Sequence, residues 1–137
     1  MKEKRLDIMD FVLLAFPVLL FVGILTFFKP CGPTEDGGWM HCHWAGQTVT
    51  VLAAALLVLG VLRLFLRPVA RIGIDVSVVV ISAAALFVPG RLIPLCMMPQ
   101  MRCRAVMTPC VTVLSILMIV VAAVDIALKR RKQKHEV

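Results

Sequence analysis

The sequence has few charged residues for its length, and this scarcity excludes an ordinary soluble domain. Charged residues make up 17% of the 137 positions, whereas hydrophobic residues make up 61%. Soluble domains are about a quarter charged and about half apolar, and a small fold cannot hide so large an apolar excess from water. Lipid is therefore the expected solvent for most of the chain.

Several motifs that would mark an enzyme or a nucleic-acid-binding protein are also missing. No Ser-His-Asp set or phosphate-binding loop supports a hydrolase, and no Cys-x-x-Cys pair is present. The net charge of +7 does not form a soluble basic surface, because the basic residues flank apolar runs. The sequence favours a protein that is not an enzyme and that has no nucleic-acid partner.

What the sequence does contain is a series of four long apolar runs, 11–28, 45–62, 72–90 and 105–124. A helix needs about 20 apolar residues to cross a bilayer, and only a helix satisfies its own backbone there. The runs predict an all-α membrane fold, a single domain over 1–137 that forms an antiparallel bundle of four transmembrane helices. We expect helices at about 8–28, 45–66, 72–89 and 106–128, joined by outer loops 29–44 and 90–105.

The distribution of basic residues predicts how the chain is oriented. The side with both tails and the middle loop has eleven lysines and arginines, and the outer loops have four. Because basic residues are retained in the cytoplasm, both termini are expected there, in a multi-pass protein of the cell membrane. The eleven are Lys2, Lys4, Arg5, Arg63, Arg67, Arg71, Lys129, Arg130, Arg131, Lys132 and Lys134.

The two halves of the chain resemble each other, which predicts a parallel two-helix repeat. Each half has a cysteine, then a Met-basic-Cys-basic cluster, then the stretch Val-Thr-Val-Leu. The clusters are 40–43 and 101–104, and the stretches are 49–52 and 111–114. Both halves enter the membrane from the same side, so the repeat axis would lie along the membrane normal.

Four cysteines, Cys31, Cys42, Cys96 and Cys103, lie in or beside the outer loops, where an oxidising compartment allows disulfides to persist. Four cysteines have three possible pairings, and spacing does not choose between them. Pairing within each loop would staple the loops separately, and pairing across loops would join them into one ordered extracytoplasmic cap. Cys110 is left over, and it is expected to be a buried small apolar residue in the last helix.

The outer loops also support two alternative functions. Soft ligands select copper and imidazole suits copper or zinc, so a copper or haem site is one alternative. Thiol-redox chemistry is the other, because arginines flank Cys103. The candidate metal ligands are His41, Cys42, His43, Met97, Met98, Met101 and Cys103, and the residues expected to shape the cap are Trp39, Trp44, Arg102 and Arg104.

Two acids lie inside the predicted helices near their cytoplasmic ends. Asp75 follows Arg71 by four residues, and Asp125 precedes Lys129 by four. Residues at this spacing share one face of a helix. Interfacial ion pairs, Asp75 with Arg71 and Asp125 with Lys129, are therefore expected.

The segments PCGPTEDGGWMHCHWAG and PGRLIPLCMMPQMRCRAVMTP resemble those of an uncharacterised family of small bacterial and archaeal four-helix membrane proteins, a domain-of-unknown-function family. Members of that family are similar to small proteins encoded beside ABC-type export permeases. The resemblance implies an accessory role beside such a permease. We therefore expect a non-enzymatic accessory protein with a disulfide-stapled cap, no cofactor, and two partners: the bilayer and another membrane protein.

Overall fold

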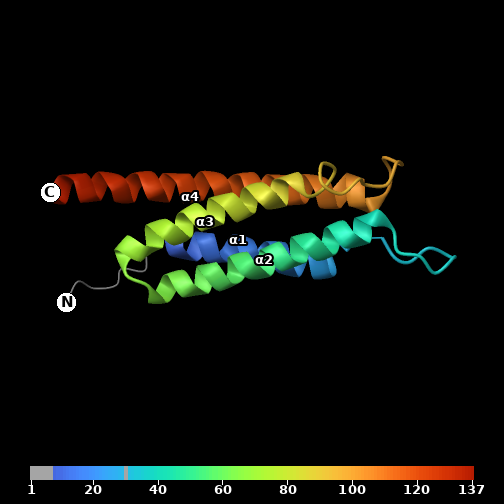
Figure 1. The fold of residues 1–137 in the computed structure, drawn as a ribbon, viewed down its shortest axis with the longest axis horizontal. Helices are drawn as coiled ribbons and strands as arrows, with labels where there is room; N and C mark the ends of the chain where they lie inside the picture. Colours follow the sequence, from blue (N-terminus) through green and yellow to red (C-terminus); the bar gives the residue numbers. More distant parts are fainter. Residues whose placement is uncertain (1–7, 30) are drawn as a thin grey trace.

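A computed structural model describes residues 8–29 and 31–137 of the chain. Its four long helices are α1 (Ile8–Thr26), α2 (His41–Phe65), α3 (Pro68–Phe87) and α4 (Thr108–Glu136). A short π-helix, η1 (Cys103–Met107), leads directly into α4. The helices follow one long axis, and consecutive helices are antiparallel (Figure 1).

All four helices are long and apolar enough to cross a membrane, which confirms the predicted all-α membrane fold. Their outward faces carry large exposed apolar side chains such as Phe11, Val51 and Val80. In a bilayer such faces meet lipid tails instead of water. The chain is therefore a multi-pass membrane protein.

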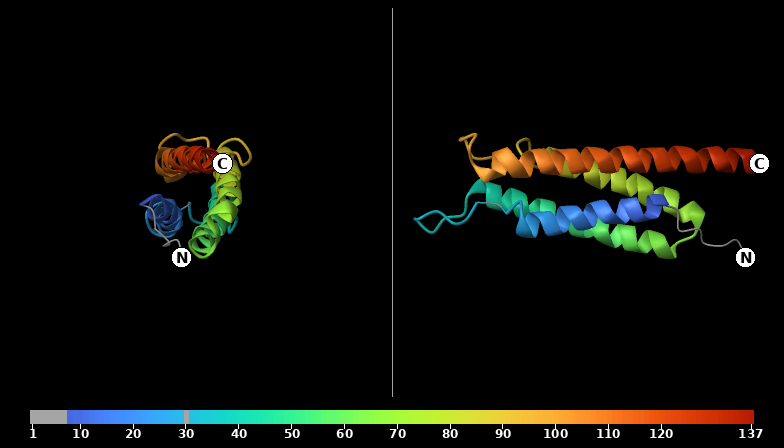
Figure 2. Two further views of the ribbon diagram at one scale, coloured as in Figure 1. Left: turned by 90° about the vertical axis from the view of Figure 1, so that its left-hand side faces the viewer. Right: turned by 180° about the vertical axis from the view of Figure 1, so that it is seen from behind.

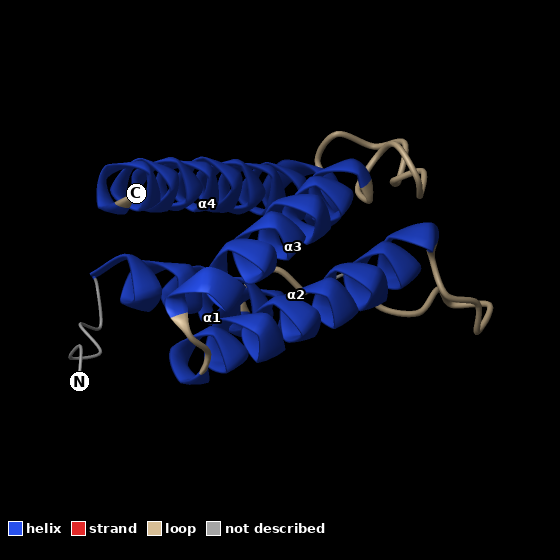
Figure 3. Cartoon of the chain, turned by 60° about the vertical axis from the view of Figure 1, so that its left-hand side comes forward, coloured by secondary structure: helices blue, strands red, loops and turns tan. Residues whose placement is uncertain are grey.

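The two ends of the bundle differ in character. The start of α1, the turn between α2 and α3, and the end of α4 lie together at what we call the terminal end (Figure 2). Both long loops lie at the opposite end, which we call the loop end (Figure 3). We refer to residues 31–40 and 88–102 as the cap. Every functional residue considered below belongs to one of these two ends.

Two helices are longer than their apolar runs indicate. α2 begins at His41, so that Cys42, His43 and Trp44 lie in its first turn. α4 continues to Glu136, through a basic segment of good helix formers. The apolar runs record where lipid surrounds the chain, and a helix does not have to end at that boundary.

The interior divides into two apolar clusters, one toward each end. The cluster nearer the loop end contains Leu20, Val49 and Val111, and the other contains Leu13, Leu56 and Met118. Small residues allow the helices to approach closely, as is usual in membrane bundles. At Gly60, a Cβ atom would lie only 3.1 Å from the side chain of Leu14 on α1.

The geometry supports the internal repeat. Asp10 and Cys31 are 21 residues apart, and so are Asp75 and Cys96. Within the bundle, the closest packing joins α1 to α2 and α3 to α4, while the α2–α3 and α1–α4 interfaces are smaller and similar to each other. A two-fold axis along the bundle would relate the helices in this way.

The π-helix η1 explains one irregularity of the repeat, the spacing that follows its second cysteine. Cys42 and Val49 are seven residues apart, whereas Cys103 and Val111 are eight residues apart. A π-turn accommodates one extra residue without breaking the helix. The extra residue of the second half therefore lies in η1, and it leaves both Cys103 and Val111 buried.

Local hydrogen bonds order the two loops of the cap. In the first loop, Thr34 donates its hydroxyl to the Gly38 carbonyl at 2.6 Å, across a turn in which Gly37 has φ of 78°. In the second loop, Gly90 has φ of 87°, and its amide donates to the Ile93 carbonyl at 3.1 Å. Ile93 and Leu95 then pack against the apolar cluster below.

Candidate functional site

The four cysteines of the cap region converge at the loop end. The Cys31 sulfur lies 2.8 Å from the Cys103 sulfur, and the Cys42 sulfur lies 3.4 Å from that of Cys96. The sulfurs of Cys31, Cys42 and Cys96 all lie within 4.8 Å of one another. We call these four residues the cysteine cluster, and the structure carries them as free thiols.

Each cysteine of the cluster comes from a different element. Cys31 lies at the start of the first loop, and Cys42 lies in the first turn of α2. Cys96 lies in the second loop, and Cys103 opens η1. Because neighbouring helices are antiparallel, the chain brings all four elements to one end of the bundle. Both close pairs join the first half of the chain to the second.

Burial divides the cluster into two kinds of cysteine. Cys42 and Cys103 have 0% of their surface exposed. Cys31 and Cys96 are half-buried, and each lines a separate pocket of the cap. Each close pair therefore consists of one accessible and one inaccessible sulfur.

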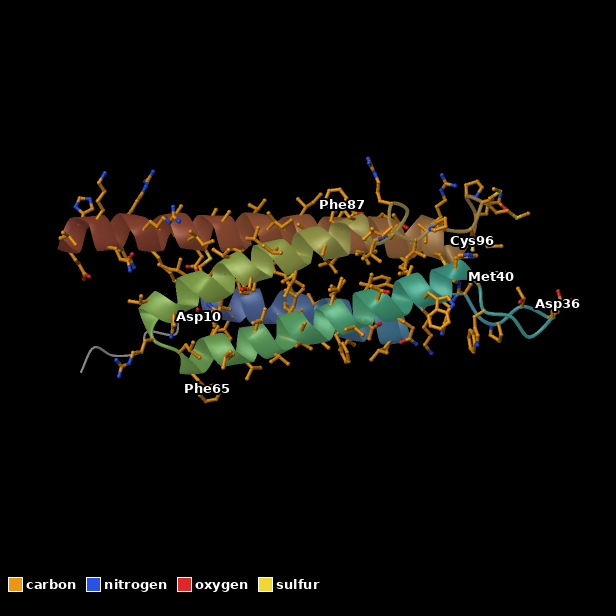
Figure 4. All side chains as sticks on the ribbon, viewed as in Figure 1. Asp10, Asp36, Met40, Phe65, Phe87 and Cys96 are labelled. Atoms are coloured by element: carbon orange, nitrogen blue, oxygen red, sulfur yellow. The ribbon has the colours of Figure 1, made fainter. Side chains whose placement is uncertain are left out.

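Met40 lies between the two pockets. It lines the Cys31 pocket of about 390 Å³ and the Cys96 pocket of about 310 Å³. Its thioether sulfur lies 3.8 Å from the Cys96 sulfur, and the two side chains are close together at the loop end (Figure 4). Met40 opens the first Met-basic-Cys-basic cluster of the sequence, but it was not among the seven candidate metal ligands.

The environment of Cys96 disfavours its thiolate. Partial burial, together with the neighbouring Cys42 sulfur, raises the pKa of the Cys96 thiol to about 11. Because the thiolate is the reactive form, reduced Cys96 is a poor nucleophile at neutral pH.

The remaining predicted metal ligands do not converge on one point. His41 and Met97 line the Cys96 pocket, and Met101 lines the Cys31 pocket. His43 stacks on Trp39, with ring centroids 4.1 Å apart. Met98 is exposed. Of the seven predicted ligands, only Cys42 and Cys103 belong to the cysteine cluster.

The predicted cap-shaping residues lie on the outer surface of the loop end. Trp39 and Trp44 are both more than half exposed, and Trp44 contacts the His43 ring edge-on at a centroid distance of 5.9 Å. Arg102 lines the Cys31 pocket together with Lys29. Arg104 is exposed. Of the two arginines, Arg102 therefore lines the same pocket as a cluster cysteine, Cys31.

Cys110 lies apart from the cluster, in the first turn of α4. It is half-buried and lines an apolar pocket of about 500 Å³ between α1 and α4. Phe27 and Phe28 line the same pocket. Cys110 is therefore less buried than the sequence indicated, because α1 and α4 separate at this level.

A second cluster of polar side chains occupies the terminal end of the bundle. Arg63 of α2 is only 2% exposed and donates to three carboxylates: its Nε bonds to Asp10 at 2.9 Å, and its two terminal nitrogens bond to Asp75 and Asp125. Lys129 bridges the same two carboxylates of Asp75 and Asp125, at 3.0 and 2.7 Å. We call these residues, with Arg71, the ion-pair network.

The ion-pair network changes one prediction and confirms another. Asp125 pairs with Lys129 as the spacing predicts. Arg71 instead pairs with Asp10 of α1 at 3.2 Å, and Asp75 turns inward to Arg63. The four-residue spacing did not predict the Asp75–Arg63 pair. Asp75 faces the bundle axis, where the long side chain of Arg63 reaches it from α2.

Comparison with known proteins identifies one family and no individual relative. A family model described as "Domain of unknown function (DUF4418)" matches residues 13–128, which include both loops and all of the cysteine cluster. Neither the search of curated proteins nor the search of solved structures found a match.

Proposed function

Because the chain belongs to the family described as Domain of unknown function (DUF4418), we propose its function from its own geometry. The protein is a non-enzymatic accessory protein of the cell membrane, with both termini in the cytoplasm and a disulfide-stapled cap outside. The observation that carries the proposal is the pairing of sulfurs across the loops, Cys31 with Cys103 and Cys42 with Cys96.

The pairing favours one of the three possible disulfide patterns. In both pairs the two cysteines lie far apart along the chain, by 72 and 54 residues. A disulfide across such a span ties the two halves of the bundle together, which a disulfide within one loop cannot do. The pattern also agrees with the repeat, because each pair joins the first cysteine of one half to the second cysteine of the other.

The surface of the cap supports a role in interaction. Large apolar side chains are exposed there, and Met97 has 94% of its surface free. Exposed apolar patches on a rigid support are typical of protein–protein or membrane contact sites. Trp39, Leu92 and Met98 of the cap are also exposed, and so is Trp44 in the first turn of α2. We propose that another membrane protein binds here, and the resemblance to proteins encoded beside ABC-type permeases suggests such a permease.

Intact mass and disulfide mapping test the proposal directly. Protein purified without reductant should be lighter than reduced protein by the mass of four hydrogen atoms. Digestion should yield peptides that link Cys31 to Cys103 and Cys42 to Cys96. Cys110→Ser serves as the matched control and should leave both links intact. Four free thiols in the purified protein, or links within each loop, would contradict the proposal.

Co-purification tests the accessory role. A tagged protein should retain the neighbouring ABC-type permease under oxidising conditions. A variant with all four cluster cysteines changed to Ser should still insert into the membrane, because its apolar helices are unchanged, but it should lose the permease. Equal retention by this variant and by Cys110→Ser would argue against a stapled docking surface.

A soft-metal site is the second candidate, and the mutual approach of three sulfurs within 4.8 Å favours it. Reduced thiolates of Cys31, Cys42 and Cys96 suit Cu(I) or Zn²⁺, and the Met40 thioether is a further soft donor. Elemental analysis of the purified protein tests it. Bound copper or zinc that Met40→Leu or Cys31→Ser weakens, and that His41→Gln and Met98→Leu leave unchanged, would favour this candidate.

A further inference from the structure

The arrangement of the cysteine cluster has the features of a reactive site as well as of a staple. The closest sulfur pairs are Cys31 with Cys103 and Cys42 with Cys96. The gap between the pairs is also short, because Cys31 and Cys42 lie within 4.8 Å of each other. A modest side-chain movement would therefore bring a sulfur of one pair onto the other.

Access from outside favours one point of entry. Cys31 opens into a pocket lined by Lys29 and Arg102, whereas its partner Cys103 is fully buried. An external thiol can therefore reach Cys31 and cannot reach Cys103. Cys96 opens into a separate pocket whose lining contains no lysine or arginine.

We propose that the two cysteine pairs form a thiol–disulfide exchange site, which an acidic extracytoplasmic dithiol peptide or protein enters at Cys31 and from which electrons pass to the Cys42–Cys96 pair. This inference rests on the cross-loop pairing of the proposed function. It departs from the non-enzymatic role proposed above, because it gives the staple a redox activity.

Entry takes two steps. An external thiolate attacks the Cys31 sulfur, so a bond forms between the two sulfurs while the Cys31–Cys103 bond breaks and Cys103 leaves as a thiolate that takes up a proton. The second thiol of the same dithiol then attacks the external sulfur and releases Cys31. The dithiol is oxidised to a disulfide by two electrons, and Cys31 and Cys103 are reduced.

Transfer takes two more steps. The Cys31 thiolate attacks the Cys42 sulfur, so a Cys31–Cys42 bond forms and the Cys42–Cys96 bond breaks. The released Cys96 sulfur takes up a proton. Cys103 then attacks Cys31 and releases Cys42. The Cys31–Cys103 disulfide is restored, and the two electrons reside on Cys42 and Cys96.

The decisive experiment uses the unaltered protein. One equivalent of dithiothreitol reduces one disulfide and is then removed, and samples are quenched, alkylated and mapped after increasing times. Free thiols should first appear at Cys31 and Cys103 and later at Cys42 and Cys96, while the total stays at two per protein. Thiols that stay where they first appear would overturn the inference. Absence of any disulfide at the start would instead overturn the proposed function.

Trapping the intermediate provides a second test. In Cys96→Ser, the Cys42 sulfur is free beside the Cys31–Cys103 disulfide. Mapping should find two species, one linked between Cys31 and Cys103 and one between Cys31 and Cys42. Cys110→Ser is the control and should show the two native links alone. A Cys96→Ser protein with the Cys31–Cys103 link as its single species would contradict exchange.

Small thiols of different charge test the substrate class. Mercaptoethanesulfonate is anionic and cysteamine is cationic. The rate at which each thiol reduces the protein is divided by the rate at which it reduces a small disulfide in solution. The anionic thiol should reduce the protein about tenfold faster at low ionic strength, because Lys29 and Arg102 attract it. The preference should disappear in Lys29→Gln/Arg102→Gln. Equal normalised rates on the unaltered protein would show that the substrate is not selected by its acidity.

Discussion

Arg63 is the residue on which the terminal end of the bundle depends. All three of its side-chain nitrogens contact carboxylates, and the three carboxylates come from α1, α3 and α4. One guanidinium therefore joins all four helices. The planar fork of arginine suits this role, because a lysine presents a single nitrogen.

Replacing Arg63 should destabilise the protein more than replacing any exposed basic residue. Arg63→Ala leaves three buried carboxylates without their shared partner, and loss of one member of a buried ion pair costs about 3–5 kcal/mol. Thermal unfolding in detergent should show a large loss of stability for Arg63→Ala. Arg63→Lys should be intermediate between Arg63→Ala and the unaltered protein. Exposed Lys132→Ala is the control and should change stability by less than about 0.5 kcal/mol. Equal unfolding temperatures for Arg63→Ala and Lys132→Ala would contradict this role.

Cys96 should react with alkylating reagents in an unusual pH range. Its raised pKa of about 11 means that the thiolate forms only in strong base. In the reduced protein, alkylation of Cys96 by iodoacetamide should accelerate about tenfold per pH unit from pH 7 to about 10. A peptide of residues 91–99 is the control, and its rate should level off near pH 9, because an ordinary thiol has a pKa of about 8.5. A plateau at the same pH in the protein would show that its environment does not suppress the thiolate.

At the scale of elements, the close approach of α1 and α2 depends on a glycine. Gly60 leaves space for Leu14, whose side chain would lie 3.1 Å from an added Cβ. The ion pair between Asp10 and Arg63 also joins α1 to α2. Separation of the two helices would therefore disturb both apolar packing and the ion-pair network.

A large side chain at position 60 should separate these helices. Gly60→Leu overfills the interface, and overpacking typically costs about 1–3 kcal/mol. Gly73 of α3 is the matched control, because an added Cβ there meets nothing within 4 Å. Gly73→Ala should leave stability unchanged or raise it by up to about 1 kcal/mol, because alanine favours helix over glycine. Thermal unfolding of both variants checks the contrast, and equal stability would argue against close α1–α2 packing.

The π-helix η1 shows how an element can adjust a repeat. It takes up the one residue by which the Cys103–Val111 spacing exceeds the Cys42–Val49 spacing. Without it, α4 would be rotated by about 100° relative to Cys103, the angle that one residue contributes to an α-helix. The position of the Cys103 sulfur beside Cys31 therefore depends on this irregular turn.

At the scale of the whole molecule, the two polar clusters lie at opposite ends of an apolar bundle. The ion-pair network joins the helices at the terminal end, and the cysteine cluster lies at the loop end. The apolar clusters between them consist of packed side chains. This division predicts that the two ends face opposite sides of the membrane.

The orientation is testable by labelling intact cells. A membrane-impermeant maleimide, after reduction, should modify Cys31 or Cys96, the accessible members of the cluster. A tag placed after Val137 should be digested by protease only in opened cells, because the basic residues are expected to retain both tails in the cytoplasm. The Cys31→Ser/Cys96→Ser variant is the labelling control. Digestion of the tag from outside would contradict either the even number of crossings or the direction of insertion.

Much of the fold follows from the sequence, because the signals that determine it are local. Each apolar run identifies its own helix without reference to the others, and the basic residues beside the runs predict the orientation. Regular spacing also revealed the repeat. The positions of the four cysteines relative to the apolar runs predicted that they lie at one end of the bundle. The Asp125–Lys129 pair was predictable for the same reason, because its two members share one helix face.

Tertiary structure alone decided which side chains meet. Spacing left three cysteine pairings open, and only the positions of all four helices place Cys31 beside Cys103, 72 residues away. The role of Arg63 was likewise not predicted, because a basic residue at the end of an apolar run is usually interpreted as marking the edge of the membrane. Its partners come from three other helices. The sequence pattern does not show how one helix is rotated relative to another, so it could not reveal these contacts.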